Sequence, residues 1–118
     1  MPKITDDELA KVRTANPRGV KVLTVIPEDA PADADGDDYV FRKIDRAAYT
    51  KHRSMQRRAL VGQGGGDEAS MLARALLVWP TVADFDALRE SAPAVPEDFG
   101  NFLIEDANAG LMVREGKR

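Results

Sequence analysis

Apolar positions follow two periods along this chain, one typical of helices and one typical of strands. The first element is helical. Thr5 is followed by three acidic residues, which is a capping-box signature, and Leu9 and Val12 then supply a short apolar face. The segment 16–19, Asn-Pro-Arg-Gly, ends this helix because a proline disfavours helix in the residue before it.

Two apolar runs rich in β-branched and aromatic residues follow, VKVLTVI at 20–26 and YVFRKI at 39–44. The residues between them, 27–38, are mainly Pro, Ala, Asp and Gly and predict a solvated loop. We therefore expect an antiparallel hairpin. Because an isolated hairpin is only marginally stable, helices should pack on one of its faces.

The helical period returns at 46–60, where Asp45 is placed to cap the helix. Its apolar stripe consists of Ala48, His52, Met55 and Ala59, and arginines lie on the opposite side. The glycine-rich segment 62–66 predicts a flexible linker after this helix.

Three further helices are expected. The first, 68–79, is apolar around most of its circumference, which is typical of a central helix, and Pro80 stops it at Trp79. Thr81 caps the second, which ends near Pro93, and Pro96 opens the third, with Gly110 as its C-terminal cap.

This order predicts an α+β fold, because the strands form one run and the helices another. We expect a single domain over 1–118. It comprises a helix and hairpin in 1–44, a part with four short helices in 45–110, and a tail at 111–118.

Composition narrows the class of protein. The chain has 118 residues, of which 43% are hydrophobic, 31% are charged and only 6% are aromatic, as in a soluble globular domain. It has no cysteine, which excludes disulfides and thiol chemistry. No apolar run approaches the roughly 18 residues of a membrane span, and no secretory signal is visible, so we expect no membrane partner.

Charge is unevenly distributed, although the net charge is only −3. Six acidic residues lie between 28 and 38, and seven basic residues lie between 42 and 58. The basic stretch could face phosphates, but it lacks interleaved aromatics and any nucleic-acid-binding signature. We therefore expect a solvated or protein-facing basic helix, and nucleic acid is not an expected partner.

Two motifs that could carry chemistry are incomplete. The alternating Asp33, Asp35 and Asp37 depart from an EF-hand, since Asp38 and Ile44 stand where glycine and a bidentate glutamate are needed. A solvated turn is expected there, with cation binding left open. The glycines at 62–66 are followed by neither Lys-Ser nor Lys-Thr, so they do not form a phosphate-binding loop.

The single histidine, His52, lies on an apolar stripe, and one histidine cannot make a His-based metal site. A serine triad would need Ser54 or Ser70, and neither is in a nucleophile signature. We therefore expect a buried or half-buried structural histidine. We expect no catalytic, cofactor-binding or metal-binding residue, and not an enzyme.

The C-terminal helical region carries more apolar residues than one helix face can bury. Phe99, Phe102, Leu103 and Ile104 cannot all point in one direction, so part of this region should face a partner. Either the basic helix or the acidic loop before the second strand would supply a charged rim. The expected partner-binding residues are Phe85, Leu88, Phe99, Phe102, Ile104, Arg53, Arg57 and Arg58.

The order of these elements resembles the small tail assembly chaperones of long-tailed bacteriophages. The strand YVFRKI leads through the capped turn IDRAAY into a basic helix ending KHRSMQRR, and the apolar helix ARALLVWP ends in an aromatic-proline step. The resemblance covers about residues 39–110. It is carried by Val78-Trp79-Pro80, Phe85, Leu88, Pro93, Pro96 and Phe99.

The resemblance implies a non-enzymatic chaperone that binds tape-measure and tail-tube proteins during tail assembly. It implies a location in the host cytoplasm and absence from the finished particle. The alternative is a structural or adaptor protein that remains in the virion. Homo-oligomerisation stays open, and residues 1–38 have no counterpart in the resemblance.

Overall fold

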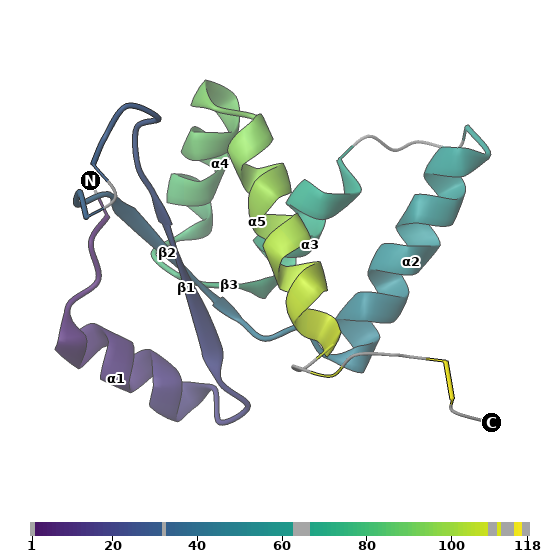
Figure 1. Cartoon of the computed structure of the whole chain (residues 1–118), viewed down its shortest axis with the longest axis horizontal. Coiled ribbons are helices and arrows are strands. Elements are labelled where there is room, and N and C mark those ends of the chain that lie inside the picture. Colours follow the sequence, from purple (N-terminus) through teal and green to yellow (C-terminus); the bar gives the residue numbers. More distant parts are fainter. Residues whose placement is uncertain (1, 32, 63–66, 109–110, 112–114, 117–118) are drawn as a thin grey trace.

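The computed structural model describes residues 2–31, 33–62, 67–108, 111 and 115–116. The fold is α+β, as predicted: helices and a three-stranded antiparallel sheet with the strand order β1-β2-β3 (Figure 1). In chain order the elements are α1 (Asp6–Ala15), β1 (Val20–Val25), β2 (Asp37–Arg42), α2 (Arg46–Leu60), α3 (Glu68–Leu76), β3 (Leu77–Trp79), α4 (Val82–Ser91), α5 (Ala94–Glu105) and the 3-10 turn η1 (Asp106–Asn108).

Three predicted helix caps are confirmed. The Thr5 hydroxyl accepts from the Glu8 N–H and the Glu8 carboxylate accepts from the Thr5 N–H, which completes the capping box of α1. Asp45 accepts from the Ala48 N–H at 2.8 Å, and α2 spans the residues predicted for it. Thr81 caps α4 in the same way, by accepting from the Asp84 N–H. Each cap satisfies an N–H that has no partner inside its helix.

The apolar segment before Pro80 differs from the sequence prediction. The helix expected at 68–79 ends at Leu76, and Leu77–Trp79 form the strand β3 beside β2. Pro80 disfavours helix in the residue before it, and the open edge of β2 offers backbone hydrogen bonds that a frayed helix end lacks. Val78 and Trp79 are also residues that favour strands. The Trp79–Pro80 peptide is cis.

Smaller boundary differences affect the hairpin and the last helix. The strand predicted at 39–44 is β2, shifted to Asp37–Arg42, and α5 begins at Ala94 rather than at Pro96. Most of the predicted linker at 62–66, the predicted cap Gly110 and most of the tail at 111–118 lie outside the described residues.

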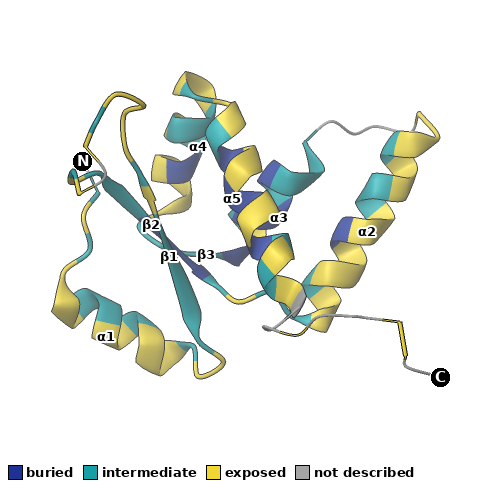
Figure 2. Ribbon diagram, in the orientation of Figure 1, coloured by how far each residue is buried: buried dark blue, intermediate teal, exposed yellow. Residues whose placement is uncertain are grey.

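The main core lies between one face of the sheet and the helices α3, α4 and α5. Tyr39 and Phe41 of β2 point to this face, and the Phe99 ring of α5 packs against both at centroid distances of 5.3 and 5.1 Å. Figure 2 shows the buried residues concentrated in β2, α3 and α5. The remaining members of this core are Leu72, Ala73, Leu76, Phe85 and Leu103.

A second, smaller apolar cluster lies on the opposite face of the sheet. Val40 is fully buried, yet side chains alternate along a strand, so it points away from Tyr39 and Phe41. Its neighbours across the sheet are Val22 and Trp79. The Trp79 indole N–H donates to the Glu8 carboxylate at 3.1 Å, which fastens α1 to this face (Figure 1). The sheet therefore lies between α1 and the helices of the main core.

Candidate functional site

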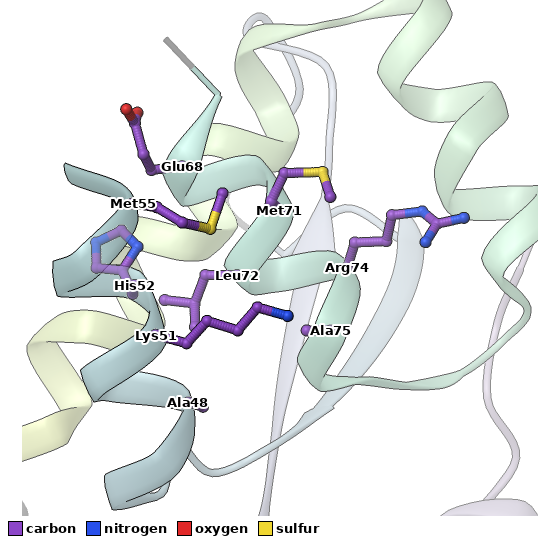
Figure 3. Close-up of a pocket in the computed structure, with 9 residues that line it drawn as sticks. All are labelled: Ala48, Lys51, His52, Met55, Glu68, Met71, Leu72, Arg74 and Ala75. Carbon is purple, nitrogen blue, oxygen red and sulfur yellow. The ribbon is translucent and has the colours of Figure 1, made fainter. Parts of the chain in front are cut away.

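A groove of about 260 Å³ separates α2 from α3 (Figure 3). Its walls are mainly apolar, and Met55 of α2 faces Met71 and Leu72 of α3. Methionine side chains adapt to irregular shapes and are common on surfaces that accept varied partners. The complete lining is Ala48, Lys51, His52, Met55, Glu68, Met71, Leu72, Arg74 and Ala75.

The groove follows from the way α2 is attached. Of the 15 residues of α2, all of them described, His52 is the one buried residue. The helix packs mainly against α3, and Figure 1 shows it standing at one side of the molecule. Its inward stripe includes two alanines, Ala48 and Ala59, whose small side chains leave space that larger residues would fill.

His52 lies in the wall of the groove beside Met55 (Figure 3) and is 3% exposed, which confirms the predicted burial. Neither ring nitrogen meets strict hydrogen-bond geometry with a described residue, but the main chain of Glu68 lies near enough to the imidazole to act on it. Burial lowers the pKa of His52, and the main chain and carboxylate of Glu68 oppose this shift. The wall thus contains a neutral imidazole that could donate or accept a hydrogen bond.

We expect the free energy of unfolding to fall as the pH decreases through 6.5, because the unfolded chain takes up a proton that folded His52 resists. The contribution of His52 is complete above pH 6.5, the ordinary pKa of a histidine, and is lost as the pH falls toward the lower folded-state pKa. Urea titrations of the wild type and of His52→Phe, between pH 7.5 and 5.5, measure this. Since the chain has a single histidine, the variant should show a flatter profile, and equal slopes in both proteins would contradict the assignment.

Helix α2 is strongly basic. The helix has five cationic residues and no acidic one, and none of the five forms an ion pair among the described residues. By contrast, Arg74 and Arg89 of the helical core pair with Asp86 and Asp67 at 3.0 and 2.9 Å. The pairing with Arg74 lowers the pKa of Asp86. Lys51 lies at the groove, and the other four cations of α2, Arg46, Arg53, Arg57 and Arg58, lie outside the residues that line it.

Arg74 is a partial exception among the groove residues. Figure 3 shows its guanidinium directed away from the groove, toward α4, where Asp86 holds it. Lys51 instead extends across the groove toward Ala75. The positive charge available to a molecule in the groove therefore comes from α2.

A second hollow adjoins the groove at the end of α2. Glu68 lines both, and Arg53, Arg57 and Leu60 line the second. Leu60 and Val61 are 86% and 69% exposed, far more than apolar side chains in a packed core. Apolar surface with a basic rim therefore continues along α2 to its last turn.

The structure separates the predicted partner-binding residues into two groups. Phe85 and Phe99 are buried in the main core, and Leu88 and Ile104 are half-buried against it, so these four do not form an open surface. Phe99 and Leu103 are four residues apart and share the inner face of α5, whereas Phe102 points outward and is 52% exposed. The exposed members are Phe102 on α5 and Arg53, Arg57 and Arg58 on α2.

Sequence reasoning missed the groove residues Met55, Met71 and Ala75 as a site. Their stripes were visible at helical spacing, but only the arrangement of α2 against α3 shows that the two stripes leave a gap between them. The described parts of the chain contain no group of three or more His, Asp or Glu side chains placed to hold a metal ion. None of the described helices combines the length and apolar character needed to cross a bilayer.

Comparisons of the chain with known protein families, with curated proteins and with solved structures gave no match.

Proposed function

We propose that the protein is a non-enzymatic assembly chaperone of a long-tailed phage, which binds the tape-measure or tail-tube protein while the tail is built. The observation that carries the proposal is the apolar groove between α2 and α3, beside cations of α2 that form no ion pair with any residue the structure describes. Such a surface suits a long apolar helix that must be covered until other subunits replace the cover. The resemblance over residues 39–110 supports the same function, since that range includes both groove helices.

The host cytoplasm is the corresponding location in this proposal. The alternative function is a structural or adaptor protein that stays in the virion. The same groove would then be occupied permanently, as in an obligate interface. Mass spectrometry of purified particles separates the two, because a chaperone should be absent from them and an adaptor present.

The direct test is co-expression with the tape-measure protein of the same phage genome. We expect the soluble fraction of the tape-measure protein to rise and the two chains to co-purify. A tape-measure protein that remains insoluble, with no co-purification, would contradict the proposal. An unrelated long helical protein expressed in the same way is the control for a general solubilising effect.

A further inference from the structure

On the basis of the proposed function, we infer that the segment this protein binds is an amphipathic helix with acidic flanks, which lies along α2 with its apolar edge in the groove between α2 and α3. Two features of the described residues carry the inference: the charge of α2, and the volume and lining of the groove.

The positive charge of α2 favours a partner that carries negative charge. Its five cations have no acidic partner among the described residues, although acidic side chains are plentiful elsewhere in the chain. Because the whole chain has a net charge of −3, the part outside α2 is strongly acidic. A partner with acidic flanks is attracted by α2, and complementary charges speed encounter and fix the register of binding.

The groove is suited to side chains rather than to a complete small ligand. Its volume of about 260 Å³ lies below the roughly 300–1,000 Å³ typical of small-molecule pockets. An amphipathic helix places apolar residues at i, i+3, i+4 and i+7, and such side chains can occupy a groove between two helices. The adjoining hollow with exposed Leu60 extends the apolar track along α2.

A nucleic acid is the other polyanion that could meet α2. The groove walls do not favour it, because they are mainly methionine, leucine and alanine and include no Phe, Tyr or Trp on which bases could stack. The acidic remainder of the chain also repels a long polyanion. A protein segment therefore fits the groove and the cations of α2 better than a nucleic acid does.

The test uses the full chain and a library of helical peptides with a fixed leucine stripe, in which the flanking positions vary among Glu, Lys and Gln. We expect selection on the protein to enrich Glu over Lys at the flanks by about tenfold, equivalent to 1.4 kcal/mol. Binding of the selected peptide should weaken as salt is raised. No selected binder, or no preference for Glu, would overturn the inference.

Two substitutions with the same charge test the groove. Ala75→Glu places a carboxylate at an exposed position inside the groove, and Ala87→Glu does so at an exposed position on α4, outside the residues that line it. Since both change the net charge equally, only Ala75→Glu should reduce peptide affinity, by about tenfold or more. Circular dichroism verifies that both variants fold. Equal affinities would show that the groove is not used.

A second matched pair tests the charge of α2. Lys51, Arg53 and Arg57 changed together to Glu should abolish the preference for acidic flanks. The same change at three exposed cations elsewhere, Lys11, Arg13 and Lys43, should leave the preference in place. Binding of an RNA or DNA duplex that exceeds peptide binding and ignores Ala75→Glu would overturn the inference in favour of a nucleic-acid site.

The two proposals can fail separately. If the wild type and Ala75→Glu solubilise the tape-measure protein equally well, the chaperone function is supported and binding in the groove is contradicted. The opposite result is also possible: the protein selects acidic helices, Ala75→Glu abolishes this selection, and the tape-measure protein is unaffected. That result would support the specificity of the groove and contradict the proposed phage function.

Discussion

Replacing Phe85 with alanine is expected to lower the free energy of unfolding by about 3–5 kcal/mol. The Phe85 side chain is fully buried between α4 and the rest of the main core, so its removal loses apolar burial and leaves a cavity. A domain of this size has about 5–15 kcal/mol of stability, so the loss is a large fraction of the total. Urea denaturation monitored by circular dichroism measures it.

Phe102→Ala provides the matched control. The Phe102 side chain is 52% exposed on the outer face of α5, and its truncation should change the free energy of unfolding by less than about 1 kcal/mol. The comparison also tests which phenylalanine can meet a partner. Similar losses for the two variants, or a Phe85→Ala protein of wild-type stability, would contradict the placement of Phe85 in the core.

The second large effect is expected at Gly100, where α5 crosses α3. A Cβ added to Gly100 would lie 2.6 Å from the carbonyl carbon of Ala69 and would overlap the rest of that carbonyl group. The obstacle is backbone, so it cannot rotate aside, and α5 would have to move away from the helix that it contacts most extensively. We expect Gly100→Ala to cost about 1–3 kcal/mol or more.

The sign of this effect is informative because helix propensity predicts the opposite. Alanine in place of a glycine inside a helix gains about 1 kcal/mol when nothing obstructs it. A stabilised Gly100→Ala protein would therefore show that α3 and α5 are not in close contact at this point. Gly116→Ala, where an added Cβ meets no atom within 4 Å, is the control and should have little effect.

The elements that could be predicted from the sequence are those with local signals. The caps at Thr5, Asp45 and Thr81 each depend on a side chain and a backbone N–H three residues later, and all three form as expected. The α+β class follows from the change in hydrophobic period. By contrast, β3 was predicted as helix because its three residues continue an apolar run. These residues instead pair with the open edge of β2, which is distant from them in sequence, so no local signal indicated the strand.

The candidate site was harder to predict from the sequence, because it also depends on contacts between elements that are separate in the chain. The basic stretch was visible as charge, and Arg53, Arg57 and Arg58 do lie exposed on α2. Whether a phenylalanine faces the core or solvent depends on the rotation of its helix, which separates Phe99 from Phe102 only once α5 is placed. The groove itself is a property of two helices together, so no single stretch of sequence contains it.

Strand β2 is the central strand of the sheet, and it is synthesised before most of the residues that cover it in the folded protein. The chain reaches Tyr39, Val40 and Phe41 well before the residues that cover them on either face, which come from Leu72 to Leu103 and from Trp79. At translation rates of about 5–20 residues per second, the strand that is most deeply buried in the folded protein stays uncovered for several seconds after it leaves the ribosome. A protein proposed to shield the apolar surface of others thus emerges with an interval in which its own is unshielded.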